Sequence, residues 1–127
     1  MADICNLNMN KNEIALINHQ GLKLTSGIQI QSPSPSIGLA YIGAYIKKNG
    51  YDYTAIDACG EALSKVRRAV PGSDLLIQGL TNEDIIKKIS NDVKIVGLTA
   101  LFSHAWFLAR DIAAEVKKNF PHSLIVV

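Results

Sequence analysis

PSIGLAYIGAYIKKNGYDYTAID, residues 35–57, holds a complete helix-to-strand unit and decides the fold. Ser36 can cap the start of a helix with its hydroxyl, and Gly50, after two lysines, can end that helix in the left-handed conformation. Residues 53–57 are then short, apolar and β-prone. This order predicts a helix that returns the chain to the next strand of a parallel sheet.

Three other segments are apolar runs that predict strands: residues 13–18 (EIALIN), 93–99 (VKIVGLT) and 124–127. The run at 93–99 is nearly continuous, as expected for a strand whose two faces are both covered by helices. The segment at 124–127 begins a fourth strand of the same sheet.

Helices are predicted between these strands. Thr81 and Asp84 have the spacing of a capping box, which predicts a helix over 82–90. Apolar residues at i, i+3 and i+4 predict helices over 60–70 and 105–119. Residues 75–78 fit either an extended segment or a buried approach to the next helix, and the sequence does not separate the two.

The alternation predicts one α/β domain over residues 1–127, with a doubly wound, mostly parallel sheet of the Rossmann or flavodoxin type. We expect the strand order 2-1-3-4, with the first and third strands as neighbours. A sheet of this type usually has a fifth strand, so the chain is expected to be an N-terminal fragment of a longer multidomain protein. Ligands of such sheets bind beyond the carboxyl ends of the strands, at the switch point between those neighbours.

A long connection precedes the helix that Ser36 begins. Residues 22–24 (LKL) and 28–31 (IQIQ) alternate around a polar centre and are followed by SPSPS, so we expect a small hairpin or an ordered flap. The connection is longer than an ordinary strand-to-helix turn, which favours a function such as covering a ligand.

Composition excludes several classes of protein. No apolar run approaches the roughly 18 residues needed to span a bilayer, and the first dozen residues have no signal-peptide core. The net charge of +2 comes from scattered residues, so no nucleic-acid surface is indicated. Lys65, Arg67 and Arg68 are interpreted as a solvated helix face. Cys5 and Cys59 have no CxxC spacing and are interpreted as structural or incidental thiols of a cytoplasmic protein.

The expected switch point supplies the candidate site. Thr99 can offer its hydroxyl to a ligand nitrogen, and Leu101 can line a slot for a flat heterocycle, although Thr99 can equally satisfy a local backbone group. Ser103 is either a site residue or the N-cap of the next helix. Gly38 allows a close approach by a ligand or by the sheet. Trp106 and Phe107 are each expected in the core rather than beside the ligand.

These residues resemble the cobalamin-binding domain at the amino end of cobalamin-dependent radical S-adenosylmethionine enzymes. The likeness rests on PSIGLAYIGAYIKKNGYDYTAIDA, on GLTNEDIIKKI followed by VKIVGLTALFS, and on the closing FPHSLIVV. Of the three sequence signatures of cobalamin-binding domains, S/T-x-L is matched by Thr99-Ala100-Leu101. D-x-H-x-x-G is replaced by NHQG, and Gly-Gly would begin just beyond Val127.

The resemblance implies a cobalamin-binding module whose small-molecule cofactor sits at the switch point. His19 is then either a loop histidine or a cobalt ligand. The implied cofactor-binding residues are Asn18, His19, Ser34, Gly38, Thr99, Ala100, Leu101, Phe102 and Ser103. The parent protein, through a radical S-adenosylmethionine domain in cis, would bind a [4Fe-4S] cluster and S-adenosylmethionine and perform methyl transfer or related radical chemistry. This chain has no CxxxCxxC motif for such a cluster and is not expected to be a catalyst alone.

Other functions remain open on the same fold. A receiver-type signalling domain would need acidic residues where Asn18 and Thr99 stand. A nucleotide or flavin binder would need a phosphate-binding loop after the first strand, and neither GxGxxG nor a Walker sequence is present. A degenerate domain that keeps the sheet without binding a ligand is the remaining alternative.

Overall fold

The computed structural model describes residues 13–26 and 34–127, and its centre is a four-stranded parallel sheet. In space the strands follow the order β3 (Thr54–Asp57), β1 (Ile14–Asn18), β6 (Ile95–Leu98) and β7 (Leu124–Val126). The α/β class and the parallel sheet are therefore confirmed, and β1 and β6 are neighbours. Within this sheet the four expected strands have the order 2-1-3-4, but the order over the whole chain differs from the expectation because three further strands form a second sheet.

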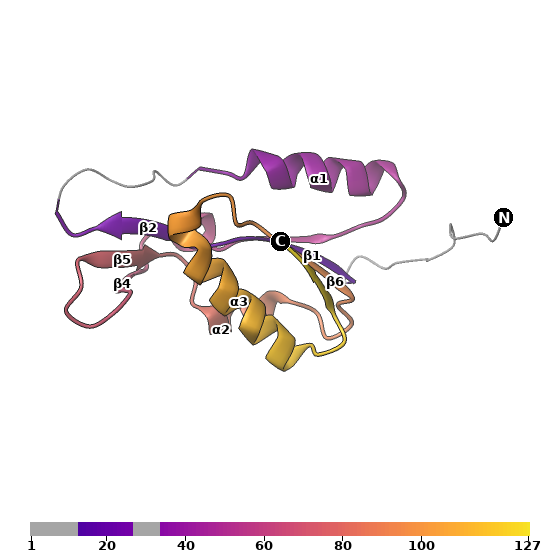
Figure 1. Ribbon diagram of the computed structural model, residues 1–127. Coiled ribbons are helices and arrows are strands. Elements are labelled where there is room, and N and C mark those ends of the chain that lie inside the picture. The colour runs from indigo at the N-terminus through magenta and orange to yellow at the C-terminus, as the bar shows by residue number, and fades with distance from the viewer. Residues whose placement is uncertain (1–12, 27–33) are drawn as a thin grey trace.

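Helices cover both faces of the parallel sheet (Figure 1). α2 (Asn82–Lys88) and α3 (Trp106–Asn119) lie on one face, and α1 (Ile37–Lys48) lies on the other. The main core fills the space between the sheet and α2 and α3. Its fully buried members include Ala15, Ile17, Ile56, Ile85, Val96, Ile112 and Val116.

α1 begins and ends as its sequence predicts. The Leu39 N–H donates to Ser36 Oγ at 3.3 Å, and Gly50 follows the helix with a φ of +83°. Gly43 is the only buried residue of this helix. A Cβ atom at Gly43 would lie 2.2 Å from the hydroxyl oxygen of Tyr53, so α1 rests on the Tyr53 ring at this one position. α1 therefore buries fewer residues than α3, which has four.

The prediction of a helix over 60–70 is wrong. Gly60–Ala62 forms a single 3-10 turn, and Val66–Arg68 is strand β4, which pairs antiparallel with β5 (Leu75–Gln78). Pro71 and Gly72, with a φ of +80° at Gly72, reverse the chain between these two strands. β5 also pairs antiparallel with β2 (Gly21–Leu24), which gives a second sheet in the order β2-β5-β4.

The connection after β1 thus contributes β2, whose partner is β5. The remainder of the hairpin or flap expected there, residues 27–33, lies outside the described residues.

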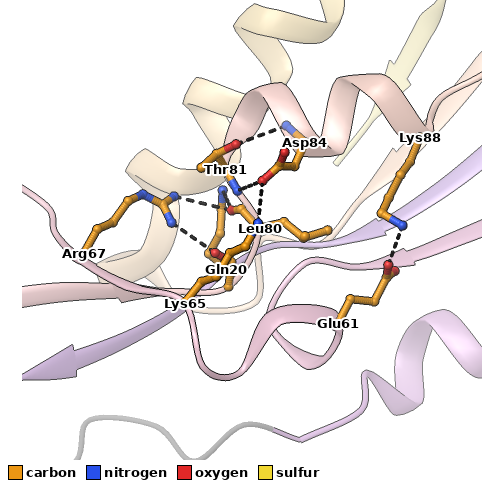
Figure 2. A network of polar contacts seen from close by, with 9 residues as sticks. Gln20, Glu61, Lys65, Arg67, Leu80, Thr81, Asp84 and Lys88 are labelled. Atoms are coloured by element: carbon orange, nitrogen blue, oxygen red, sulfur yellow. Dashed lines mark hydrogen bonds and ion pairs between the residues drawn. The ribbon is translucent and has the colours of Figure 1, made fainter.

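A polar network joins this second sheet to the start of α2 (Figure 2). Arg67 of β4 donates to the carbonyl oxygens of Gly79 and Leu80 at 3.1 and 3.4 Å, and Gln20 Nε2 donates to the same Leu80 oxygen at 3.2 Å. Lys65 Nζ lies 3.2 Å from Asp84 Oδ2. Arg67 and Arg68 are therefore part of strand β4, which Lys65 precedes, and the interpretation of this basic cluster as a helix face is wrong.

Both hydrogen bonds of the expected capping box at the start of α2 are present. Thr81 Oγ1 accepts from the Asp84 N–H at 3.1 Å, and Asp84 Oδ2 accepts from the Thr81 N–H at 3.4 Å. α2 ends at Lys88, slightly earlier than expected.

The start of α3 differs from one alternative that the sequence left open. Ser103 does not cap the helix, because Ser103–Ala105 forms its own 3-10 turn and Ala105 occupies the N-cap position without a side-chain hydrogen bond. Ala105 and Leu108 instead pack with Leu22 of β2 in a small second core. This packing fixes the start of α3 against the antiparallel sheet.

Candidate functional site

A cleft of about 1300 Å³ separates α1 from the parallel sheet. Strand alternation explains its floor. Ala15 and Ile17 of β1 point into the main core, so Ile14 and Leu16 face the opposite side and line the cleft. Gly97 of β6 also lines it, and a Cβ atom there would lie 2.8 Å from Leu16 Cδ2. The side chains of residues 13–26 and 34–127 therefore do not fill the opening beside β1 and β6.

The residues predicted for the site come together in this cleft, with one exception. Ser103 is not part of the lining, because it belongs to the 3-10 turn before α3. The predicted residues that do line the cleft are Asn18, His19, Ser34, Gly38, Thr99, Ala100, Leu101 and Phe102. Among the described residues, and apart from the chain next to Gly38 and the helix's own backbone, no heavy atom lies within 4 Å of the place a Cβ would take at Gly38, so this position is open.

Hydrogen bonds connect the ends of three neighbouring strands at the polar end of the cleft. Thr99 Oγ1, just after β6, donates to Asn18 Oδ1 at 3.1 Å and accepts from the His19 N–H at 3.2 Å. Asn18 Nδ2 donates to Asp57 Oδ1, at the end of β3, over 3.0 Å. The Gly60 N–H donates to the same Asp57 oxygen at 3.1 Å. The Thr99 hydroxyl is thus used locally, the alternative that its sequence context left open.

His19 lies at the edge of this network and is only 7% exposed. Its Nδ1 lies 2.6 Å from the carbonyl oxygen of Gln20. Because a carbonyl oxygen only accepts, Nδ1 carries a proton, and the neutral tautomer with this hydrogen bond has its lone pair on Nε2. Within residues 13–26 and 34–127, no group of three His, Cys, Asp or Glu side chains is arranged to hold a metal ion.

Apolar side chains with large exposed areas form the walls of the cleft. Leu101 is 80% exposed and Trp106 is 50% exposed, and both line it. Trp106 therefore lies outside the core, contrary to expectation, whereas Phe107 packs against the small second core as expected. Trp106 stands at the first position of α3. Phe102 is stacked on the ring of His104, with centroids 5.5 Å apart.

Sequence reasoning missed several lining residues. Ile42 and Ile46 of α1 face the cleft, and their i, i+4 spacing was the available signal. Cys59, interpreted as a structural or incidental thiol, lines the cleft and is 6% exposed. Burial is the main reason that the pKa of the Cys59 thiol is raised. Cys5 lies outside the described residues.

A scan against protein-family models and searches of curated proteins and of solved structures found no match to this chain. In the part of the chain that the structure describes, no helix combines the length and apolar character required to cross a bilayer. Because no match was found, the function of the site is inferred from its own residues.

Proposed function

We propose that the cleft between α1 and the parallel sheet binds a flat cofactor with a tail, and that this cofactor is cobalamin. The observation that carries the proposal is the position of the cleft: it opens at the switch point between β1 and β6, where ligands of doubly wound sheets bind. Its volume of about 1300 Å³ exceeds the ~300–1000 Å³ typical of small-molecule pockets. A ligand larger than a drug-sized molecule therefore fits the space.

The residues present suit such a ligand. Asn18 and Thr99 would meet polar groups at one end of the cleft, whereas Leu101 and Phe102 offer apolar surface to a planar ring. The open space at Gly38 would let the ligand approach the backbone of α1. The match of Thr99-Ala100-Leu101 to the S/T-x-L signature supports the same assignment.

His19 is the residue that would contact cobalt. Metal-bound histidines generally donate the N–H of the other ring nitrogen to a carbonyl or carboxylate, as His19 Nδ1 does to Gln20, which leaves Nε2 for the metal. When bound, cobalamin would supply a transferable methyl group. By the family resemblance, this chain is a cofactor-carrying part of a longer protein whose radical S-adenosylmethionine domain performs the reaction.

Titration of the full chain with hydroxocobalamin, followed by equilibrium dialysis and by absorbance, tests the proposal. We expect retention of the corrinoid at micromolar concentrations. We expect Leu101→Asp to weaken binding at least tenfold, because it places a charge on the apolar wall. Tyr41→Asp is the matched control, since Tyr41 is 76% exposed on α1 but does not line the cleft. No binding at high micromolar concentration, or equal losses in both variants, would reject the proposal.

The same titration examines the role of His19. If His19 Nε2 ligates cobalt, His19→Ala changes the absorbance spectrum of the bound corrinoid, whereas an unchanged spectrum shows that His19 is only a loop residue.

A further inference from the structure

The Asp57 carboxylate determines which atom donates and which accepts in each hydrogen bond at the polar end of the cleft. An ionised carboxylate only accepts hydrogen bonds, so the Asn18 atom 3.0 Å from Asp57 Oδ1 must be the amide nitrogen. The Gly60 N–H donates to the same Asp57 oxygen at 3.1 Å and holds the carboxylate in place. Asp57 therefore fixes which way the Asn18 amide points.

The orientation of Asn18 in turn fixes the proton of Thr99. With its nitrogen on Asp57, Asn18 presents its oxygen to Thr99 Oγ1, 3.1 Å away, so the Thr99 hydroxyl must be the donor of that bond. The His19 N–H occupies one of the two lone pairs of Thr99 Oγ1, at 3.2 Å. What Thr99 retains for the cleft is a single lone pair and no proton.

We infer that Thr99 acts as a hydrogen-bond acceptor toward the ligand, so the ligand group that reaches it is a donor, such as a hydroxyl, an amide N–H or a ring N–H. This inference rests on the proposed function only in that the cleft holds a ligand. The ring nitrogen of a benzimidazole tail whose other nitrogen carries a sugar is an acceptor, so it would not be the partner of Thr99, contrary to the expectation that Thr99 offers its hydroxyl to a ligand nitrogen. Asn18 keeps one amide hydrogen beyond the one given to Asp57, so acceptors on the ligand are met by Asn18.

Two isosteric probes test this polarity. Indole carries a ring N–H donor, whereas benzofuran has an oxygen at the same place and no donor. Each is titrated into the ¹⁵N-labelled chain, and the shifts of the Thr99 and His19 amide signals report binding at this end of the cleft. A net hydrogen bond of ordinary strength makes indole bind roughly fivefold more tightly than benzofuran.

Matched variants assign the preference to the named residues. Thr99→Val removes the acceptor and lowers the indole-to-benzofuran ratio to about one, whereas Thr99→Ser retains it. Asp57→Asn also retains the ratio, because the Gly60 N–H keeps the remaining carbonyl oxygen of residue 57 turned toward Asn18. Asp57→Ala frees the Asn18 amide to turn over and lowers the ratio. The two Thr99 variants suffice if Asp57→Ala does not fold.

Equal or tighter binding of benzofuran to the wild-type chain overturns the inference. So does the absence of any shift at Thr99 and His19 with both probes up to their solubility limits, because Thr99 would then not be offered to a ligand. The outcome is independent of the cobalamin titration. If indole binds more tightly but no corrinoid binds, the inference about Thr99 holds and cobalamin is not the ligand. If a corrinoid binds but benzofuran binds more tightly than indole, cobalamin remains the ligand and the inference about Thr99 is wrong.

Discussion

The contact between Gly43 and the Tyr53 ring allows a quantitative test of how α1 is attached. A Cβ atom at Gly43 would lie 2.2 Å from the Tyr53 hydroxyl oxygen and 2.3 Å from Cζ, distances that force the ring or the helix to move. Gly38, in the same helix, has no heavy atom within 4 Å of its Cβ position. Gly43→Ala and Gly38→Ala therefore differ mainly in what the new methyl group meets.

Helix propensity favours both substitutions by up to about 1 kcal/mol, because alanine loses less backbone entropy than glycine. Overpacking at Gly43 costs about 1–3 kcal/mol, whereas Gly38→Ala has no such cost. We therefore expect Gly38→Ala to raise the free energy of unfolding. Gly43→Ala should lie about 1–3 kcal/mol below it, since the propensity terms cancel in the comparison.

Urea denaturation followed by circular dichroism measures the two free energies, and hydrogen exchange of the α1 amides shows whether the helix opens locally. Gly43→Ala in a Tyr53→Leu background is the control, because removal of the phenol makes room for the methyl group and should turn the effect of the substitution stabilising. Equal changes in the two single variants would refute a tight contact at Gly43.

Three further outcomes follow from the structure. Hydrogen bonds with Thr81 and Lys65 lower the pKa of Asp84 in the folded chain below its usual value of 3.8. The ionised Asp84 therefore stabilises the fold fully above about pH 4, and this stabilisation is lost as the pH falls through the lowered pKa of the folded state. Urea denaturation between pH 5 and 2 should therefore show a shallower loss of stability for Asp84→Asn than for the wild-type chain. In a Cys5→Ser background, we expect iodoacetamide to modify Cys59 slowly at neutral pH, because burial raises its pKa, and hydroxocobalamin to slow the reaction further; mass spectrometry measures both rates. Ile112→Ala should lower the free energy of unfolding by about 2–5 kcal/mol, because Ile112 is 1% exposed in the main core, and an effect below 1 kcal/mol in urea denaturation would contradict that packing.

Local sequence was sufficient to predict the helix ends that are marked by capping residues. The Ser36 cap, the Gly50 stop and the Thr81–Asp84 box all act within four residues, and each is present as expected. Local sequence gave a wrong prediction for residues 60–70, where the spacing of apolar residues suits a helix. There the deciding partner is β5, which reaches β4 only because the chain reverses at Pro71 and Gly72. Antiparallel pairing of this kind overrides a weak helical preference.

The candidate site divides in the same way. The carboxyl ends of β1 and β6 could be placed from the alternation of strands and helices, so Asn18 and Thr99 were found. Asp57 was not, because its role depends on the Asn18 side chain crossing to the next strand. Cys59 was missed because only the folded chain brings it beside Gly21, where an added Cβ atom would lie 2.8 Å from its sulfur.

The central position of β1 has a consequence for synthesis on the ribosome. β1 is made first, yet Ala15 pairs with Thr54 and Ile14 pairs with Ile95. At the usual ~5–20 residues per second, the second of these partners follows on the order of 4–16 s later. During that interval the apolar segment IALIN has no neighbour on at least one edge, which makes the nascent chain a natural client for chaperones that hold extended apolar peptides.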